Sequence, residues 1–302
     1  MRTTKILVLL ALFVVWFAAG CNINNSTKIT NSIVDEKQPQ TTEKQTVTNS
    51  HLQVHFLDVG QGDCELIQLP SGKNLLIDAS TREQAGTVIA YLNKLGIKKL
   101  DIVIATHPHE DHIGGLDNVI NTFQIGQVIM PKKEANTQTY KDLITAVAGK
   151  GMKITVAKAG LKLDLGQGVD AELVAPNSTS YEDVNDYSAV VRLVYGKNSF
   201  LFTGDAQTES EKQMISSGYM LGADVLKVGH HGSHTSTSAA FLAKVKPTYA
   251  VISCGKGNDY GHPHQETLKK LANSGIKLFR TDINGTIIAE SDGTSINFST
   301  SR

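Results

Sequence analysis

Beyond position 50, the hydrophobic positions of this chain form two kinds of pattern. Short apolar runs bounded by Gly, Pro, Asn or Asp predict strands, and apolar residues three or four apart predict helices. The predicted strands cover residues 52–57, 64–69, 74–77, 100–105, 125–130, 153–157, 171–175, 189–195, 200–203, 225–228 and 249–253. The predicted helices cover residues 81–95, 115–122, 136–150, 209–217, 239–245 and 265–274. Because the strands arrive in two runs, each followed by helices, the pattern predicts an α/β protein with two sheets and helices outside them.

Two turns near the C-terminus contain glycine, at Asn284-Gly285 and at Asp292-Gly293. Such dipeptides are typical of tight hairpins. We therefore expect short hairpin strands around both turns.

The first fifty residues have a different texture. Arg2 and Lys5 precede an apolar run from Ile6 to Phe17, which is short for a membrane span and is followed by small residues. The sequence Ala-Ala-Gly-Cys ending at Cys21 resembles a bacterial lipoprotein signal. It predicts a signal peptide over residues 1–20 and a lipid on Cys21, with an ordinary cleaved secretory signal as the alternative.

Residues 21–50 are rich in Asn, Thr, Gln, Ser and Lys and lack the apolar residues of a core. They predict a flexible tether. The expected domain organisation is therefore a signal peptide (1–20), a tether (21–50) and one globular domain (51–302). The expected location is the extracytoplasmic face of the cell membrane, with the lipid on Cys21 as the anchor.

Overall charge and cysteine content narrow the picture further. The chain has 29 Lys and Arg and 29 Asp and Glu, so any binding to nucleic acid must rest on a local patch rather than on a global positive field. Besides Cys21, the chain contains Cys64 and Cys254, each in or beside an apolar strand-like run. We expect them to be buried free thiols, with a disulfide as the alternative in an exported protein.

Eight of the ten histidines fall in three short clusters, at residues 107–112, 230–234 and 262–264. The first cluster, His-Pro-His-Glu-Asp-His, directly follows a predicted buried strand and includes a carboxylate. Neutral imidazole and carboxylate are ligands for divalent ions such as Zn²⁺. The clusters therefore predict a metal site at the end of a strand.

The first cluster resembles the signature of the metallo-β-lactamase superfamily. The resemblance implies a four-layered αββα sandwich with two metal ions. It assigns His107 and His109 to the first ion and Asp111 and His112 to the second. The Thr-Gly-Asp sequence ending at Asp205 resembles the motif whose aspartate bridges both ions.

A later motif in this family supplies a further ligand to the second ion, and it matches the sequence Val-Gly-His ending at His230. We favour His230 as this ligand and expect His231 to contact substrate as a catalytic residue, together with Asp111. Many members place a third histidine for the first ion ahead of the Thr-Gly-Asp motif. Here residues 185–188, Asn-Asp-Tyr-Ser, stand at that place. Either the first ion has fewer protein ligands or a distant histidine fills the gap, and His262 is the candidate, with a substrate-binding or hydrogen-bonding role as the alternative.

Five segments, 56–63, 76–78, 185–188, 229–233 and 260–263, resemble the hydrolase domain of the ComEC/Rec2 DNA-uptake proteins, over about residues 52–298. The resemblance places the loops of three aspartates near the site, where they would orient ligand imidazoles, with a role in a turn or helix cap as the alternative for each. These aspartates are Asp58, Asp63 and Asp78. Further residues are expected to bind phosphate or to assist the leaving group: Lys227, Ser233, His234 and His264.

The resemblance implies an exported metal-dependent hydrolase, and we favour a phosphodiesterase or nuclease that acts on DNA. Two divalent ions, Zn²⁺ with Mn²⁺ as the alternative, would generate a bridging hydroxide that attacks phosphorus. Single-stranded DNA is the expected substrate. Because the chain has one long apolar run, a DNA-uptake channel would be a separate partner.

Two alternatives remain open. Phosphorylcholine esterases of cell walls resemble the same subfamily, so a phosphorylcholine or teichoic-acid esterase is the alternative enzyme. The alternative of another class is a non-catalytic lipoprotein that binds DNA or a wall polymer.

Overall fold

A computed structural model of the chain describes residues 51–302. The predicted signal peptide, the tether and the lipid acceptor Cys21 lie outside the described residues. Within residues 51–302, no helix is both long and apolar enough to cross a bilayer.

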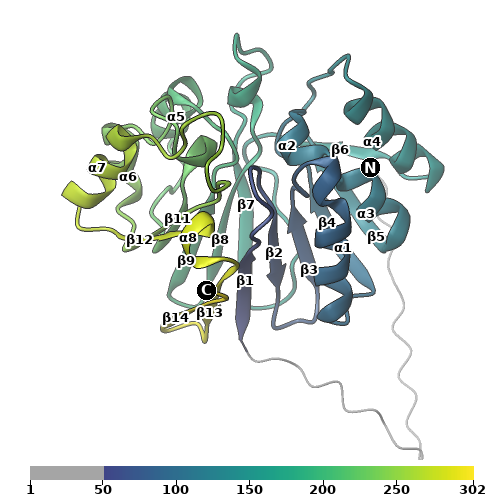
Figure 1. Cartoon of the computed structure of the whole chain (residues 1–302), viewed down its shortest axis with the longest axis horizontal. Coiled ribbons are helices and arrows are strands. Elements are labelled where there is room, and N and C mark those ends of the chain that lie inside the picture. The colour runs from purple at the N-terminus through teal and green to yellow at the C-terminus, as the bar shows by residue number, and fades with distance from the viewer. Residues whose placement is uncertain (1–50) are drawn as a thin grey trace, which may run out of the picture. The chain divides into compact units, whose positions relative to one another are not determined.

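Two sheets lie between two layers of helices (Figure 1). The larger sheet has the order β14 (Ile296–Thr300), β13 (Ile287–Ser291), β1 (Leu52–Phe56), β2 (Glu65–Gln68), β3 (Asn74–Ile77), β4 (Lys99–Ile104), β5 (Gln124–Met130) and β6 (Ile154–Val156). The smaller sheet has the order β12 (Lys277–Arg280), β11 (Tyr249–Ile252), β10 (Val225–Lys227), β9 (Asn198–Phe202), β8 (Val190–Tyr195) and β7 (Val169–Ala175).

The helices divide between the outer faces of the two sheets. Those beside the larger sheet are η1 (Arg82–Gln84), α1 (Ala85–Lys94), α2 (Glu110–Ile113), α3 (Leu116–Thr122) and α4 (Gln138–Gly149). Those that follow in the chain are η2 (Val184–Tyr187), α5 (Thr208–Ser216), η3 (Gly229–Gly232), α6 (Ala239–Val245), α7 (Gln265–Asn273) and α8 (Thr281–Asn284).

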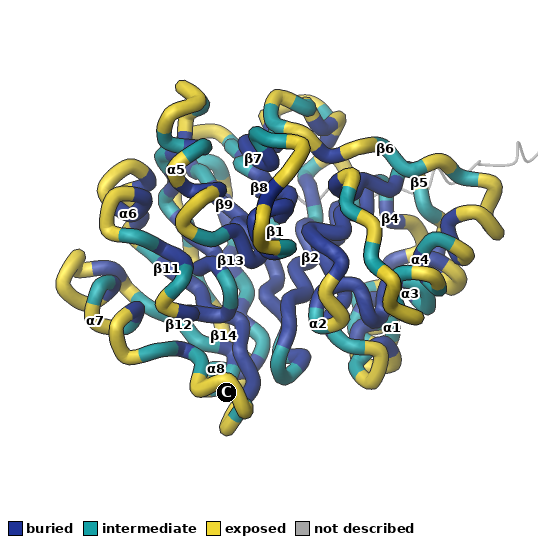
Figure 2. The backbone as a smooth tube through the Cα atoms, turned by 90° about the horizontal axis from the view of Figure 1, so that it is seen from above, coloured by how far each residue is buried: buried dark blue, intermediate teal, exposed yellow. Residues whose placement is uncertain are grey.

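Three apolar cores hold these layers together. The central core lies between the sheets, where the rings of Phe56 and Phe202 have centroids 6.1 Å apart. A second core joins the larger sheet to α1, α3 and α4, and a third joins the smaller sheet to α5, α6 and α7. Figure 2 shows the buried strands in the middle of the molecule and the exposed helix faces outside. This arrangement confirms the predicted four-layered αββα sandwich.

The last three residues of β4 and of β9 are apolar because both faces of these strands are buried there. In β4, Ile102 and Ile104 enter the core between the sheets, whereas Val103 faces the helices. In β9, Phe200 and Phe202 enter the central core and Leu201 enters the third core. Successive side chains therefore still point to opposite faces of the sheet, but both faces pack against an apolar core. For this reason the sequence shows a continuous hydrophobic run at these positions.

Parallel pairing gathers several strand ends at one edge. Strands β3, β4, β5 and β6 are mutually parallel in the larger sheet, and β9, β10, β11 and β12 are parallel in the smaller sheet. The carboxyl ends of neighbouring parallel strands lie at the same edge of a sheet. The residues that follow β3 and β4 therefore lie at one edge of the larger sheet, and those that follow β9 and β10 lie at one edge of the smaller sheet.

Two expectations for local structure are confirmed and one is wrong. Asp292-Gly293 joins the antiparallel strands β13 and β14, and both Cys64 and Cys254 are buried free thiols. Asn284-Gly285 does not form a hairpin. Asn284 ends the short helix α8, and Gly285 leaves it with a φ of 68°, a conformation that glycine adopts without steric cost.

Candidate metal centre

The first histidine cluster spans the end of a strand and the start of a short helix. His107 follows β4 and is fully buried, while His109 is the exposed residue that precedes α2. Asp111 and His112 lie in α2 itself. Nε2 of His107 lies 3.0 Å from Nδ1 of His109. The strand and the helix therefore direct all four predicted ligands of this cluster into one small region.

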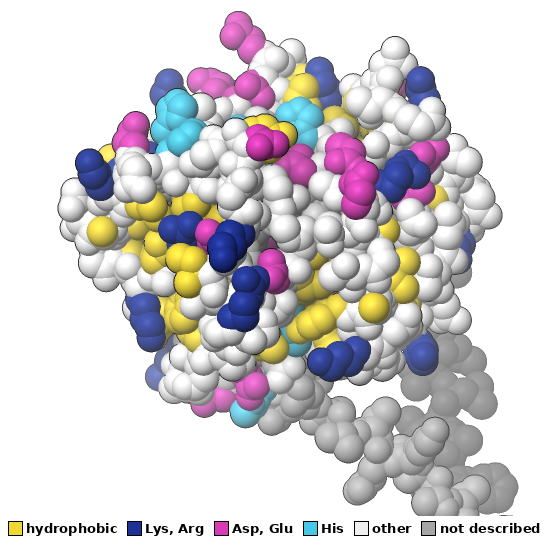
Figure 3. All heavy atoms as spheres, viewed as in Figure 1, with side chains coloured by type: hydrophobic (Ala, Val, Ile, Leu, Met, Phe, Trp, Pro, Cys, Tyr) yellow, Lys and Arg dark blue, Asp and Glu magenta, His cyan; other side chains and the backbone are white. Residues whose placement is uncertain are grey.

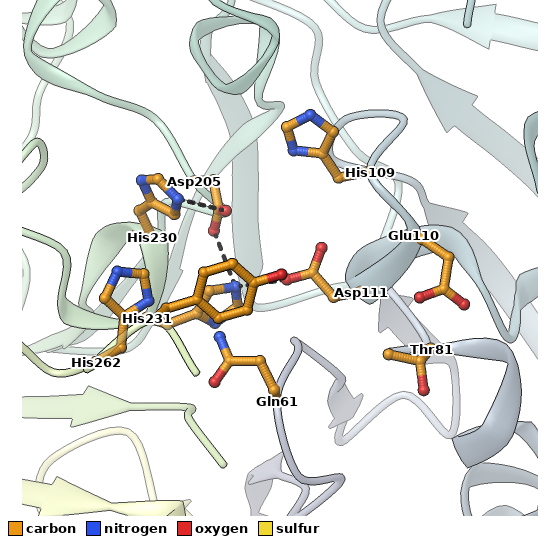
Figure 4. Close-up of a pocket in the computed structure, with 10 residues that line it drawn as sticks. Gln61, Thr81, His109, Glu110, Asp111, Asp205, His230, His231 and His262 are labelled. Atoms are coloured by element: carbon orange, nitrogen blue, oxygen red, sulfur yellow. Dashed lines mark hydrogen bonds and ion pairs between the residues drawn. The ribbon is translucent and has the colours of Figure 1, made fainter. Parts of the chain in front are cut away.

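Asp205 lies at the centre of the candidate site. One of its oxygens, Oδ2, lies 3.8 Å from Nε2 of His107, 3.3 Å from Nε2 of His112 and 3.7 Å from Nε2 of His230. The other oxygen lies 3.6 Å from Nε2 of His231. Figure 4 shows two of these four imidazoles, those of His230 and His231, beside the Asp205 carboxylate.

A tight turn presents the two adjacent histidines. His230 has a φ of 51° and His231 a φ of 53°, so both adopt the left-handed conformation that costs an L-residue free energy. The amide of His230 donates to the carbonyl of Gly204, next to Asp205, at 3.1 Å. The turn is thereby fixed to the loop that carries the central carboxylate.

His231, rather than the favoured His230, lies among the ligand-competent residues. Nε2 of His231 lies 3.1 Å from Oδ2 of Asp111, and His231 is almost completely buried. Together with Asp111 and His112 it forms a group whose ligand atoms lie close enough to share one ion. His230 is partly exposed and belongs to none of the ligand-competent groups found among the described residues.

The residues present fit a divalent-cation site. A second ligand-competent group consists of His107, His112 and Asp205, and it shares His112 with the group of Asp111 and His231. Nε2 of His112 and Oδ1 of Asp205 are buried but make no hydrogen bond within the protein. Buried polar atoms are otherwise nearly always hydrogen-bonded. Two imidazole-carboxylate groups with free, inward-directed atoms therefore suit Zn²⁺ or Mn²⁺.

Asp78 contacts one of the candidate ligands from behind. Its Oδ2 lies 2.7 Å from Nδ1 of His112 and accepts a hydrogen bond from the Thr106 hydroxyl at 2.6 Å. Its Oδ1 accepts from the Thr106 amide at 2.8 Å. A carboxylate on Nδ1 fixes the ring orientation and leaves Nε2 directed at the centre.

Asp63 has a similar position behind His231. Its Oδ1 lies 3.3 Å from Nδ1 of His231, and its Oδ2 lies 2.6 Å from Nζ of Lys227. Lys227 is almost completely buried. It therefore neutralises Asp63 inside the protein, and the expectation that it binds phosphate is not supported.

The electrostatic potential of the site favours cations. Burial opposes a charge on His112, but Asp205, Asp111 and Asp78 outweigh this effect and hold its pKa well above its usual value. In the same way, Asp205, Asp63 and Asp111 overcome burial and raise the pKa of His231 to about 10. Carboxylates that stabilise protonated imidazoles also attract a divalent ion, which would replace those protons.

Four other predicted residues lie apart from the centre. The carboxylate of Asp58 forms an ion pair with Arg302 rather than with a histidine, so its expected role behind the ligands is not supported. Nδ1 of His234 lies 2.9 Å from Nδ1 of His264, and both rings are outside the ligand-competent groups. The Ser233 hydroxyl lies 3.0 Å from that of Thr235 and helps to hold the turn.

His262 does not supply the missing third ligand in this geometry. Its ring centroid lies 5.4 Å from that of His230 and 6.1 Å from that of His231, beside them at the rim. At the place where many relatives carry a histidine, the Ser188 hydroxyl lies 3.4 Å from Nδ1 of His107 and accepts from the Asp205 amide at 3.1 Å. Ser188 therefore supports two predicted ligands from behind.

The site opens into a cavity of about 480 Å³. Its lining comprises Gln61, Thr81, His109, Glu110, Asp111, Asp205, His230, His231, Tyr260 and His262. Histidine and acidic side chains gather near the upper end of the face seen in Figure 3. The cavity gives a ligand direct access to Asp111, Asp205 and His231.

Sequence analysis missed Gln61. Its Oε1 accepts from the Gly255 amide at 3.1 Å, whereas its Nε2 is buried and has no hydrogen-bond partner. In Figure 4 the amide nitrogen points toward His231. The available signal was its position inside the Gly-Gln-Gly-Asp segment, but only the contact with a distant loop shows the direction of the amide.

Comparisons with known proteins agree with this geometry. The sequence model of the family described as "Metallo-beta-lactamase superfamily" matches residues 57–256. ComE operon protein 3 of Bacillus subtilis (strain 168) is 32% identical over 256 residues, which cover 79% of this chain and 33% of that protein. Competence protein ComA of Neisseria gonorrhoeae is 33% identical over 243 residues, which cover 80% of this chain and 32% of that protein.

The chain thus spans about a third of the length of these curated relatives. Among solved structures, CmlA, a diiron β-hydroxylase from Streptomyces venezuelae, superposes with a TM-score of 0.51 at 13% identity. The match covers 76% of this chain and 52% of that chain. At this level of identity the likeness concerns the fold alone.

Proposed function

The chain belongs to the metallo-beta-lactamase superfamily, and on that premise we propose that it is a metal-dependent hydrolase that cleaves phosphodiester bonds in DNA. The observation that carries the proposal is the pair of ligand-competent groups that share His112 around Asp205. A protein that only bound DNA or a wall polymer would have no use for buried, unpartnered ligand atoms in an open cavity.

The proposed substrate rests on the relatives. Two proteins that are 32% and 33% identical to most of this chain are named as a ComE operon protein and a competence protein. The resemblance to the hydrolase domain of DNA-uptake proteins also favours DNA as the substrate. We therefore favour DNA over a phosphorylcholine or teichoic-acid ester.

The chain's own residues would bind and orient the reactants. His107 and His109 would hold one ion, Asp111, His112 and His231 would hold the other, and Asp205 offers carboxylate oxygens to both. His112 can bind one ion only, because its Nδ1 is bonded to Asp78. Bound divalent ions lower the pKa of water to supply a nucleophile and offset negative charge on a phosphate. Asp78 holds Nδ1 of His112, and the carbonyl oxygen of Ser253 accepts from Nδ1 of His231, so each ring would keep its Nε2 for a metal ion.

The experiment uses the purified full chain, loaded with Zn²⁺ or Mn²⁺, and three substrates: single-stranded DNA, duplex DNA and p-nitrophenyl phosphorylcholine. Asp205→Asn removes the central charge while preserving shape. Asp164→Asn is the matched control, because that side chain is 89% exposed and pairs with Lys73 on the surface. Metal content is measured on every preparation.

We expect the wild type and Asp164→Asn to bind metal and to cleave DNA, and Asp205→Asn to do neither. Cleavage of the phosphorylcholine ester without cleavage of DNA would replace the proposed substrate by a cell-wall ester. Wild-type protein that binds no metal after reconstitution would overturn the enzymatic proposal and favour the binding lipoprotein.

We also propose that the chain is exported and anchored by a lipid on Cys21, from the sequence of its first residues. Metabolic labelling with radioactive palmitate tests this proposal in cells that express the chain. Label is expected in the wild type and is expected to be absent from Cys21→Ala. Equal labelling of both would contradict it.

A further inference from the structure

An aromatic side chain at the rim of the cavity is exposed and yet held in a defined position. Tyr260 is 65% exposed and lines the same cavity as Asp111 and His231. Its ring stacks on that of His262, with centroids 5.6 Å apart and planes 20° apart. His262 in turn stacks toward His231 at 6.1 Å and 29°. Three rings therefore lead from the buried candidate metal centre to the solvent.

One side chain fixes this arrangement before any ligand arrives. Oδ1 of Asn258 accepts from the amide of Tyr260 at 3.2 Å and from the amide of His262 at 3.0 Å. Its Nδ2 donates to the carbonyls of Gly255 and His262 at 2.9 and 2.6 Å. A loop closed by four hydrogen bonds presents the phenol ring with little conformational entropy left to lose on binding.

We propose that Tyr260 and His262 form a stacking subsite for a nucleobase next to the scissile phosphate, so that the substrate is single-stranded nucleic acid. The proposal rests on the proposed phosphodiesterase function. Aromatic rings bind bases of any sequence because every base has a π-face. In a duplex those faces are covered by neighbouring base pairs, so the subsite is accessible to single strands and to frayed ends.

A quaternary ammonium group, such as that of choline, also binds over aromatic faces, and it is recognised by cages of several rings. Among the described residues that line the cavity, Tyr260 is the single Tyr, Phe or Trp. One flat ring backed by an imidazole offers a platform rather than a cage. The geometry therefore favours a base over a choline head group.

The test compares a normal single-stranded oligonucleotide with an abasic oligonucleotide of equal length, on the metal-loaded full chain. Tyr260→Leu removes the platform and Tyr260→Phe retains it. We expect Tyr260→Leu to raise KM for the normal oligonucleotide about tenfold and to leave cleavage of the abasic oligonucleotide unchanged. Tyr260→Phe is expected to behave like the wild type.

A binding measurement complements the kinetics. In the Asp205→Asn background, a single-stranded oligonucleotide containing 2-aminopurine is expected to lose fluorescence when its base stacks, and Tyr260→Leu is expected to abolish this quenching. Equal cleavage of both oligonucleotides by wild type and Tyr260→Leu would overturn the subsite while the phosphodiesterase function stands. Cleavage of the phosphorylcholine ester that depends on Tyr260, without a base effect, would also overturn it. Wild type that cleaves neither oligonucleotide would contradict the proposed function itself.

A different observation concerns Gln61, at the floor of the same cavity. The Gly255 amide donates to its Oε1, which defines the orientation of the side-chain amide and leaves Nε2 buried without a partner. This contact requires the two backbones to approach closely. A Cβ on Gly255 would lie 2.7 Å from the backbone nitrogen of Gln61 and 3.1 Å from the carbonyl carbon of Gly60. The structure thus holds an unpaired donor beside Asp111 and His231, which line the same cavity.

We infer that Nε2 of Gln61 donates a hydrogen bond to a phosphoryl oxygen of the substrate. This inference also rests on the proposed function, and its supporting observation is independent of Tyr260. A fixed donor directed at developing negative charge accelerates phosphoryl transfer because it needs no reorganisation during the reaction.

Gln61→Met keeps the length of the side chain and removes the donor. We expect kcat to fall about a hundredfold with metal content unchanged. Gly255→Ala, which displaces the clamp, is expected to lower kcat in the same direction. Gln53→Met is the control, because Gln53 bonds Glu290 on β13. The inference is overturned if Gln61→Met retains at least half of the wild-type kcat, or if activity falls only in proportion to lost metal.

Discussion

Asp58 and Asp63 lie in the same glycine-rich loop, but their charges differ in how much they contribute to stability because one is buried and the other is partly exposed. Asp63 is buried against the ammonium group of Lys227, whereas Asp58 pairs with the half-exposed Arg302. Removal of one partner from a buried ion pair leaves an unsolvated charge, and removal of an exposed partner does not. The two sites therefore offer a matched comparison of the same chemical change.

We expect Asp63→Asn to lower the free energy of unfolding by about 3–5 kcal/mol, because Lys227 is left uncompensated in the protein interior. Asp58→Asn is expected to lower it by less than about 1 kcal/mol. Urea denaturation of both variants, without added metal, measures the difference. Losses of equal size would contradict the assignment of Asp63 and Lys227 as a buried pair.

His55 provides a pH-dependent prediction away from the candidate metal centre. Burial lowers its pKa from 6.5 to about 4, and its Nδ1 lies 2.9 Å from the hydroxyl of Tyr91. Between about pH 4 and pH 6.5, His55 is protonated in the unfolded chain and neutral in the folded chain. The stability linked to His55 is therefore present above pH 6.5 and is lost as the pH falls toward 4.

The size of this loss is about 3 kcal/mol, at 1.36 kcal/mol for each unit of pKa. His55→Gln cannot ionise, so we expect the wild type to lose about 3 kcal/mol relative to this variant between pH 7 and pH 4. Parallel denaturant titrations across this range isolate the contribution, since the other titrating groups are common to both proteins. A difference that does not change with pH would refute the assignment.

At the residue scale, the sequence predicted which residues form the site more accurately than it predicted their positions within it. The first two histidine clusters and the Thr-Gly-Asp motif pointed to His107, His112, His231 and Asp205, which the structure does bring together. The sequence could not decide between His230 and His231, because the choice depends on two successive left-handed residues. Likewise, Asp58 and Asp63 were indistinguishable until Arg302 and Lys227, far away in the chain, showed where each carboxylate lies.

At the scale of elements, the turn η3 and the loop around His262 depend on glycine for close contact. Gly232 has a φ of 84°, and a Cβ there would lie 2.5 Å from Cβ of Pro263, next to His262. Gly257 also has a positive φ, of 67°, but a Cβ there would meet no atom within 4 Å. The two glycines thus share the conformational constraint and differ in steric contact.

We expect Gly257→Ala to cost about 1 kcal/mol of stability from its backbone conformation alone. Gly232→Ala is expected to cost about 3 kcal/mol, because overpacking against Pro263 adds to the same backbone term. Thermal or urea unfolding of the two variants provides the measurement. If both variants lose the same stability, η3 does not pack against this loop as described.

Element boundaries were predictable where burial produced long apolar runs and less so elsewhere. The core strands β4 and β9 were expected at nearly their observed positions because both of their faces are buried. Strand β12, with the sequence Lys-Leu-Phe-Arg, was missed since it is short and lies at the edge of its sheet. Helix α8 replaced an expected hairpin because Asn284-Gly285 suits a helix end as well as a tight turn.

At the scale of the whole molecule, the candidate ligands come from both sheets. His107 and His112 follow β4 of the larger sheet, whereas Asp205 and His231 follow β9 and β10 of the smaller one. Ions bound between them would therefore connect the two halves of the sandwich. The layered architecture itself was predictable from the two successive runs of strands, but the junction of their loops required the tertiary structure.

Metal binding is accordingly expected to stabilise the whole domain. At a free metal concentration one hundred times Kd, the gain is about 2.7 kcal/mol for each independent site, which corresponds to a rise in Tm of about 5–10 °C for a protein of this size. Calorimetry of the full chain with and without Zn²⁺ tests this, and Asp205→Asn is expected to show little shift. The idea fails if Asp205→Asn is stabilised by Zn²⁺ as strongly as the wild type.

The left-handed pair in η3 also has an evolutionary meaning. At His230 and His231 an imidazole is retained in a conformation that glycine or asparagine would adopt at lower cost. A lineage that no longer needed these side chains would gain stability from such replacements and would accumulate them. Two successive histidines in this conformation are therefore expected only where the use of their side chains outweighs the cost in stability.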